Sequence, residues 1–392
     1  MTNGIEISDC GIYNATGGYA NSIPFLQRGA VTSAYTGHSS TLHCTAWNLL
    51  FLPSGDPSRA VNCGTGFPSE LVYDADTNPN GIRCAHPEHN INLLGSRVDA
   101  DGVTRALQPL DNVGVQYGLQ ALQNGTMTVE RFVDLNANIG YFNIDQNRIA
   151  GSVRRAATQE GLENAYRSGM VTDGRYLANV PIIDVRYNEP GLDIHLNWRA
   201  LSVRERLEQA NGHADNQVIW GYNQNQVPTA TVSNEAFVTM DAWLEAMEAD
   251  TSSASLADKV LANKPSLATD RCLARVTEEG VAEVRDVGLF TPECPVQFGG
   301  SPRIVAGGPV AEDVLKCQLK PLDFSSDDYR LAETGELITF TDEQQAQLGE
   351  VFSTGVCDWS RPGVAQQLNP GWMSFMNGPG GEPMELTWFQ RP

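Results

Sequence analysis

The chain has 392 residues, of which 41% are hydrophobic, so it is long enough for two ordinary domains or one large domain with insertions. Its formal net charge is −21, and such an acidic surface repels nucleic acid and anionic membranes, so we expect neither as a partner. The sequence has no apolar run of about 18 residues or more, and no membrane span is therefore predicted.

The eight cysteines form no Cys-x-x-Cys pair, and their even number and local spacing favour disulfides formed in an oxidising compartment. We therefore expect a secreted or periplasmic protein, although buried thiols in a cytosolic protein remain the alternative. The first residues lack the basic and apolar regions of a signal peptide, so we expect a fragment of a longer exported protein. Proximity suggests the pairs Cys10–Cys44, Cys63–Cys84, Cys272–Cys294 and Cys317–Cys357.

Residues 1–110 are rich in Gly, Asn, Ser, Pro and Asp, which is typical of loops and short elements. Residues 37–41 read GHSST and come near the Gly-x-Ser-x-Gly nucleophile elbow, with Ser39 as the candidate nucleophile. Thr41 replaces the second glycine, which the strained turn needs for close packing. The alternative is a Ser/Thr-rich loop that precedes a helix.

Asp76, Asn78 and Asn80, followed by Gly81, match the first half of a calcium-binding loop. The twelfth position of that loop holds Pro87 instead of glutamate. Calcium is therefore a weak candidate, and no other cofactor is predicted. Clusters of Asn, Asp, Pro and Gly also form ordinary turns, which is the alternative.

Residues 111–170 are predicted to be helical, since apolar residues recur at helical spacing over 115–122, 129–137 and 153–166. Thr128 has the character of a helix start. These helices could form a cap over an active site or could serve packing alone.

Residues 180–222 carry the strongest pattern in the chain. A strand over 180–183 precedes a loop, a helix over 196–210 that ends at Asn211-Gly212, and a second strand over 217–222. An α/β-hydrolase presents its catalytic acid on a loop after a late strand in this way.

Asp193 lies in that loop and is the first candidate for the catalytic acid, with helix capping as the alternative role. Asp184, at the strand itself, is the second candidate. His195 is the candidate base, because an extended loop places the side chains of Asp193 and His195 on one side. The usual order puts the base after the last strand, yet no histidine follows His213.

Residues 235–249 predict a helix, residues 251–268 a polar linker, and residues 269–392 a small disulfide-tied region. The packing face predicted for that helix consists of Phe237, Met240, Trp243, Leu244 and Met247.

Several strings together resemble one family: YDADTNPNGIRC, DNVGVQYGLQAL, VPIIDVRY, GLDIHLNWRALSVRERL, ADNQVIW, LKCQLKPLDF and GVCDWSRPGVAQQ. They are similar to the C-terminal part of large exported bacterial proteins of unknown function that are regarded as distant α/β-hydrolases. The resemblance implies that fuller members carry a signal peptide and a serine elbow upstream of the residue that matches Met1. It also places Asp193 and His195 at the Asp-Ile-His segment of the family.

We therefore expect an α/β fold with a hydrolase-like domain over 1–250, a cap-like insertion at about 30–170, a linker over 251–268 and a C-terminal region over 269–392. The expected activity is hydrolysis of a small-molecule or polymeric ester by a Ser-His-Asp acyl-enzyme mechanism. The serine would come from a missing N-terminal segment or a partner chain, with Ser39 as the poorer candidate within this chain. The alternative is a non-catalytic exported module for binding or structure.

Overall fold

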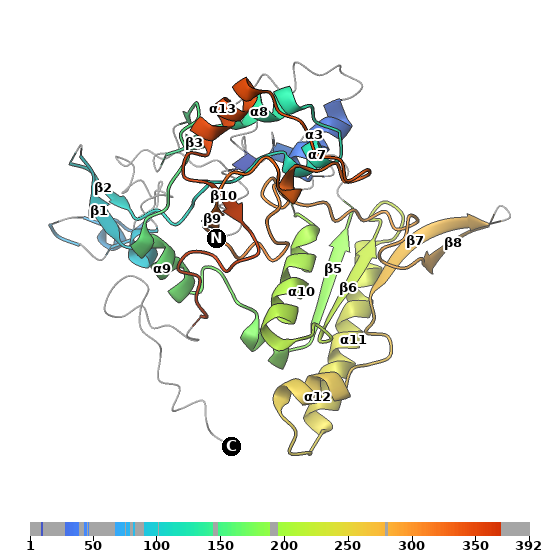
Figure 1. Ribbon diagram of the computed structural model, residues 1–392. Helices are drawn as coiled ribbons and strands as arrows, with labels where there is room; N and C mark the ends of the chain where they lie inside the picture. Colours follow the sequence, from blue (N-terminus) through green and yellow to red (C-terminus); the bar gives the residue numbers. More distant parts are fainter. Residues whose placement is uncertain are drawn as a thin grey trace. The chain divides into compact units, whose positions relative to one another are not determined.

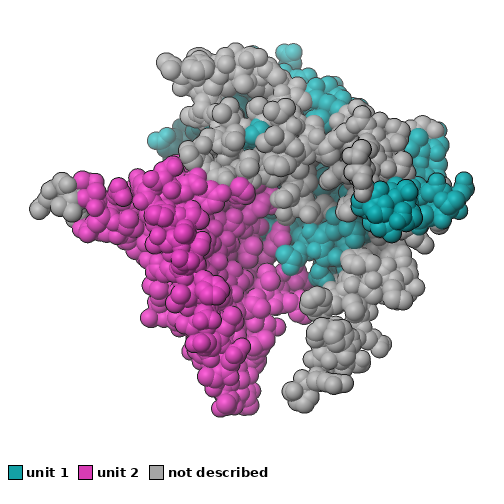
Figure 2. All heavy atoms as spheres, turned by 180° about the vertical axis from the view of Figure 1, so that it is seen from behind, with its two compact units in different colours: residues 1–172, 301–392 teal, residues 173–300 magenta. Residues whose placement is uncertain are grey.

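The computed structural model describes residues 9–10, 28–38, 43–44, 46, 67–74, 76–78, 81–82, 90–100, 102–143, 148–188, 195–278 and 281–369. The chain divides into two compact units, which Figure 2 shows in different colours. Unit 1 comprises residues 1–172 and 301–392, and unit 2 comprises residues 173–300. This division differs from the predicted boundaries, because residues 301–392 join the first part of the chain and residues 269–300 join unit 2.

Unit 2 is built on a four-stranded sheet with the order β5-β6-β7-β8 (Figure 1). The strands β5 (Ile182–Tyr187), β6 (Gln217–Tyr222) and β7 (Arg271–Glu278) are parallel, and β8 (Val281–Asp286) pairs antiparallel with β7. The predicted strand over 217–222 is thus confirmed, and the predicted strand over 180–183 begins and ends later. Among the described residues this is the largest sheet, so the observed fold is mixed α/β.

Two helices cover opposite faces of this sheet. Because side chains alternate along a strand, neighbouring residues of β6 contact different helices. Ala200 of α10 (Trp198–Asn211) packs with Ile219 on one face. Trp243 of α11 (Thr229–Ala249) packs with Trp220 on the other face. The predicted helix over 196–210 is confirmed, and it ends at Gly212, whose positive φ of 79° suits glycine.

The predicted packing face of α11 is partly wrong. Trp243 is fully buried and Met247 packs against the core, but Phe237 and Leu244 are exposed. The helix begins at Thr229, directly after Pro228, and this longer helix presents a different stripe to the sheet. That stripe has helical spacing and consists of Val232, Ala236, Thr239, Trp243 and Met247.

Residues 251–268 contain α12 (Leu256–Ala262), whereas the sequence suggested a linker. The Ser255 side chain accepts a hydrogen bond from the Asp258 amide and caps this helix. Val260 and Ala268 are fully buried in the core on the α11 side of the sheet. The segment is polar in composition, yet it contains a short helix and two buried apolar residues. A 3-10 helix, η4 (Arg175–Asn179), precedes β5.

The described residues of unit 1 form short helices and two-stranded sheets. Its helices are α3 (Arg28–Thr36), η3 (Ser69–Leu71), α6 (Ile91–Leu94), α7 (Leu119–Gln123), α8 (Val129–Asn138), α9 (Gln159–Arg167), η5 (Asp327–Tyr329) and α13 (Asp342–Val351). Its strand pairs are β1 (Ser96–Val98) with β2 (Thr104–Ala106), β3 (Tyr141–Phe142) with β4 (Arg148–Ile149), and β9 (Gln318–Lys320) with β10 (Val356–Asp358).

The two segments of unit 1 share one hydrophobic core. Phe132 of α8 and Leu348 of α13 are both fully buried in it. A buried ion pair also joins the segments, with Arg303 Nε at 3.3 Å from Asp9 Oδ2. The hydroxyl of Tyr117 donates to Asp9 Oδ1 at 3.0 Å, and burial raises the pKa of this tyrosine far above its usual range. These contacts hold residues 301–369 to the first part of the chain.

Of the helices predicted in residues 111–170, the one over 129–137 is confirmed, with Thr128 as its side-chain cap. The helix predicted over 115–122 begins only at Leu119, after Gly118 with φ 81°. The helix predicted over 153–166 begins only at Gln159, because the backbone before it forms hydrogen bonds with another segment of the chain. The Arg155 amide donates to Asn112 Oδ1 at 2.7 Å, and the Asn112 amide donates back to the Arg155 carbonyl.

Three predicted disulfides are confirmed: Cys10–Cys44, Cys272–Cys294 and Cys317–Cys357. The pair Cys63–Cys84 lies outside the described residues. No helix in the described part of the chain combines the length and apolar character that crossing a bilayer needs.

Candidate active site

The carboxyl ends of β5 and β6 lie side by side, because the two strands are parallel and in register from Ile182↔Gln217 to Tyr187↔Tyr222. The next residue, Asn188, continues the pairing through its amide, which donates to the Tyr222 carbonyl at 3.2 Å. Ligands of parallel α/β sheets bind at this edge. It is therefore the place to examine the predicted site residues.

His195 lies in the connection between β5 and α10 and is exposed. Its Nδ1 atom is 3.2 Å from the hydroxyl oxygen of Tyr187, the last residue of β5. Its backbone carbonyl accepts a hydrogen bond from Arg186 Nη1 at 3.3 Å. Contacts from two β5 residues therefore hold both the imidazole and the backbone of His195 at the sheet edge.

The turn that follows His195 has an unusual backbone. Leu196 is buried and has φ 37°, in the left-handed region that a branched side chain rarely adopts. Asn197 supports this turn, since its Nδ2 donates to the Tyr187 carbonyl at 3.1 Å and to the Gln297 carbonyl at 3.3 Å. The strained turn fixes where His195 stands relative to the end of β5.

Asp184 lies three residues before Tyr187 on β5. Its Oδ1 pairs with Arg186 Nε at 2.7 Å, and its Oδ2 accepts a hydrogen bond from Gln217 Nε2 at 3.4 Å. Gln217 Nε2 also donates to the Ala200 carbonyl of α10. The carboxylate thus joins β5, β6 and α10 within the layer between sheet and helix.

Asp193 and Ser39 lie outside the described residues. The predicted acid therefore flanks the described part of the loop, two residues before His195. The predicted nucleophile directly follows His38 in the sequence.

The connection after β6 is polar and reads NQNQVP over residues 223–228. Gln224 Nε2 donates to the Asn188 carbonyl at 3.2 Å, which joins this connection to the end of β5. Gln226 accepts a hydrogen bond from the Arg275 amide at 3.0 Å. This is the position where the usual order would place the base, and its side chains are amides that cannot act as one at neutral pH.

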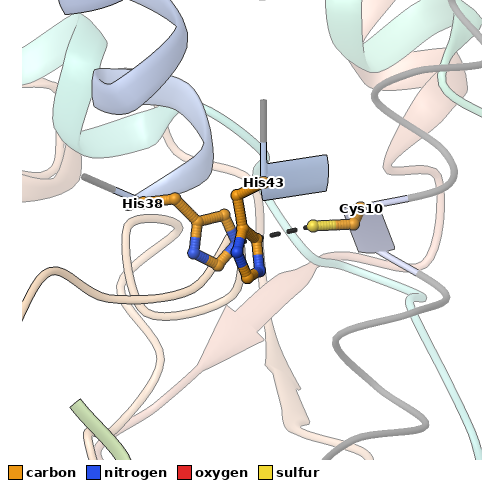
Figure 3. Close-up of side chains that lie close together, drawn as sticks. All are labelled: Cys10, His38 and His43. Carbon is orange, nitrogen blue, oxygen red and sulfur yellow. Dashed lines mark hydrogen bonds between the residues drawn. The ribbon is translucent and has the colours of Figure 1, made fainter. Parts of the chain in front are cut away.

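A second cluster of chemically reactive residue types lies in unit 1 (Figure 3). The rings of His38 and His43 are 3.7 Å apart, and the Cys10 sulfur is 3.4 Å from His38 Nε2. One ligand atom from each residue lies within 4.8 Å of the others, a spacing that a metal ion could bridge. However, Cys10 is bonded to Cys44, so the thiolate that a metal would need is absent from this oxidised form.

The predicted calcium residues form a hydrogen-bonded turn. Asp74 Oδ1 accepts hydrogen bonds from the Thr77 hydroxyl and from the amides of Thr77 and Asp76, and these bonds lower the pKa of Asp74. Asn78 Nδ2 donates to the carbonyls of Glu70 and Val72 at 3.0 Å each. Asn80 lies outside the described residues, and calcium binding stays a prediction that an unchanged melting temperature in EDTA would contradict.

Sequence reasoning missed Tyr187, which contacts His195, and Asn197, which supports the turn after it; it also missed the contact between the rings of His38 and His43. The signals were present as an aromatic residue at a strand end, an asparagine directly before a helix, and a His-x-x-x-x-His-Cys string whose cysteine pairs with Cys10.

The model of a tannase-like family of unknown function matches residues 1–368 of the chain. No curated protein and no solved structure matches it.

Proposed function

Because the chain belongs to this tannase-like family, we propose that it takes part in the hydrolysis of carboxylic esters, the reaction of a tannase. The observation that carries the proposal is the position of His195 at the carboxyl edge of a parallel sheet, where two β5 residues hold it. A histidine held in this way at a ligand-binding edge is suited to move protons during acyl transfer.

In the proposed reaction, a serine hydroxyl attacks the ester carbonyl and His195 takes the proton from that hydroxyl. His195 then gives the proton to the leaving alcohol, and an acyl-enzyme forms. Water, deprotonated by the same histidine, releases the carboxylic acid and regenerates the serine. Asp193 stabilises the positive charge on the imidazole, and Tyr187 positions the ring.

Ser39 is the nucleophile that we propose within this chain, with a serine from another segment or a partner chain as the alternative. Asp184 takes no part in the proposed reaction, since Arg186 and Gln217 engage its two carboxylate oxygens inside the sheet layer.

A fluorophosphonate probe, followed by mass spectrometry of the labelled peptide, tests the nucleophile. We expect labelling of the unaltered chain and of Ser40→Ala, a matched control, and no labelling of Ser39→Ala. An unlabelled chain with intact disulfides would remove Ser39 from the proposal.

Hydrolysis of p-nitrophenyl esters tests the base. We expect His195→Ala to lower kcat/KM by about a thousandfold or more, the order found when a member of such a triad is removed. The control is His213→Ala, which replaces another histidine of unit 2, beyond the end of α10. Equal activity in the two variants, or no turnover by the unaltered chain, would contradict the assignment.

The second candidate function is a non-catalytic exported module for binding or structure. The disulfides and the hydrogen-bonded turn over 74–78 are compatible with it, because such features stabilise exported proteins whether or not they are enzymes. A chain that neither labels nor turns over esters, yet binds a ligand with its disulfides intact, would favour this alternative.

We also propose that the protein is exported, since three disulfides suit an oxidising compartment. Protein produced in an oxidising and in a reducing host compartment should differ in melting temperature. An equal melting temperature, with free thiols in both samples, would contradict export.

A further inference from the structure

A cavity of about 680 Å³ lies in unit 1, and none of its described lining residues belongs to the proposed esterase site. Its wall combines the β1–β2 hairpin, the residues that follow β3, and residues 154–156. The volume is in the range that holds a small organic molecule. Nothing in the proposed reaction uses this cavity.

The lining is strongly basic in a chain that is acidic overall. Arg97, Arg105, Arg154 and Arg155 line the cavity, and Asp99 is the one acidic residue among its described lining residues. Three positive charges are therefore in excess at this place, although the chain carries a net charge of −21. A concentration of one sign of charge in a concave site attracts ligands of the opposite sign.

The single carboxylate is shared between two of the arginines. Arg97 Nε lies 2.7 Å from Asp99 Oδ1, and Arg105 Nη1 lies 3.4 Å from Asp99 Oδ2. Asp99 therefore occupies the hairpin side of the cavity as an internal anion. These contacts of Asp99 do not include Arg154 or Arg155.

On the side of the cavity formed by residues 154–156, two arginine side chains are buried, and burying their charge costs free energy. Arg154 is 9% exposed and Arg155 is 6% exposed, and a buried guanidinium normally has a carboxylate beside it. Arg155 Nη2 donates to the neutral Asn143 carbonyl at 3.0 Å, and no carboxylate of the described residues lies within ion-pair distance of it. Burial lowers the pKa of Arg155 to about 10, which reflects this cost.

We propose that this cavity binds a small organic anion, whose carboxylate or phosphate group pairs with Arg155 and Arg105. The planar guanidinium fork matches both oxyanions in a two-bond geometry. Tyr141, which also lines the cavity, adds an aromatic surface for the organic part of the ligand. The carboxylates of Asp9 and Asp111 offset part of the cost of the buried Arg155 charge, and the described lining of the cavity keeps its excess of positive charge.

Calorimetry and thermal melting with benzoate, phenyl phosphate, inorganic phosphate and uncharged benzamide test the proposal. We expect benzoate or phenyl phosphate to bind and raise the melting temperature, with the preferred one identifying the oxyanion. Benzamide should bind at least about tenfold more weakly, because it lacks the charge that strengthens a hydrogen bond to arginine. Equal binding of benzamide, or tightest binding of inorganic phosphate, would overturn the proposal.

Two variants locate the site. Arg155→Gln should weaken binding of the preferred probe about tenfold or more. Arg330→Gln, which alters an exposed arginine of the same unit, should leave binding unchanged.

Because Arg155→Gln could impair folding, Asp99→Asn provides a test with the opposite sign. Removing the internal anion takes away the carboxylate that competes with the ligand for Arg97, so affinity should rise severalfold. No binding by the unaltered chain, or unchanged affinity in both Arg155→Gln and Asp99→Asn, would overturn the proposal. Neither outcome bears on ester hydrolysis at His195.

Discussion

The hydroxyl of Tyr187 lies 3.2 Å from Nδ1 of His195 and joins the last residue of β5 to the first described residue after the loop. In a catalytic triad, this ring nitrogen receives the orienting partner. The contact with Tyr187 therefore orients the ring of His195 through Nδ1.

Tyr187→Phe removes this hydrogen bond and retains the ring that packs 5.9 Å from Tyr222. We expect kcat for ester hydrolysis to fall about tenfold with little change in KM, because an unheld imidazole spends less time in the productive orientation. Tyr176→Phe, at an exposed tyrosine of unit 2, is the control. Unchanged kcat and an unchanged pH profile would remove Tyr187 as a positioning residue.

Asp270→Ala should lower the free energy of unfolding by about 2 kcal/mol. The carboxylate accepts two bonds from Arg204, at 2.7 and 2.9 Å, and a third from the Ile219 amide of β6 at 2.8 Å. Urea unfolding measures the change. Glu283→Ala, which breaks the exposed pair with Arg285, should cost less than about 0.5 kcal/mol, and equal losses would contradict the assignment.

Replacing both Cys317 and Cys357 by alanine should destabilise the chain by about 4 kcal/mol, since the bond closes a loop of 40 residues. Replacing the Cys272–Cys294 pair, whose separation is 22, should cost about 3 kcal/mol. Thermal melting of both double variants, without reductant, checks the order. A larger loss for the shorter loop would show that loop entropy does not set the difference.

The stability of unit 2 should fall in acid partly through Asp250. Hydrogen bonds from Ser252 and Asn263 lower the pKa of its carboxyl to about 2. The unfolded chain binds this proton near the ordinary pKa of about 4, so the stabilisation present above that pH is lost as the pH falls toward 2.

Asp250→Asn should therefore show a smaller loss of urea midpoint between pH 4 and pH 2 than the unaltered chain, while Asp241→Asn, on the exposed side of α11, should match the unaltered chain. Parallel curves for all three proteins would remove Asp250 as a source of acid sensitivity.

The sequence predicted α10 and β6 well, because an apolar pattern marks each element and Asn211-Gly212 marks the end of α10, whereas the strand predicted over 180–183 shares only its last two residues with β5. It could not predict that Arg303 pairs with Asp9, since a contact between residues 294 apart leaves no local pattern. The linker prediction failed for a related reason. Within residues 251–268, Val260 and Ala268 lie in the buried core, and two buried residues are too few to produce a recognisable apolar period in the sequence.

The candidate site was predictable in part. His195 follows from the strand–loop–helix order, whereas Tyr187 lay in the loop predicted after residue 183, and its contact with His195 was not predicted. Arg154 and Arg155 looked like the polar side of a helix, because their spacing permits one. Hydrogen bonds of this backbone with Asn112 and Asp111 take the place of helical ones, and Arg154 and Arg155 line a cavity.

The division of unit 1 into two segments has a consequence for biosynthesis. All of residues 173–300 leave the ribosome before Arg303 does, so unit 2 can fold while Asp9 still lacks its cation. Until α13 has been synthesised, the core around Phe132 lacks Leu348. The nascent chain can thus carry a folded unit 2 before unit 1 is complete, and the core of unit 1 is the part that a chaperone would need to shield.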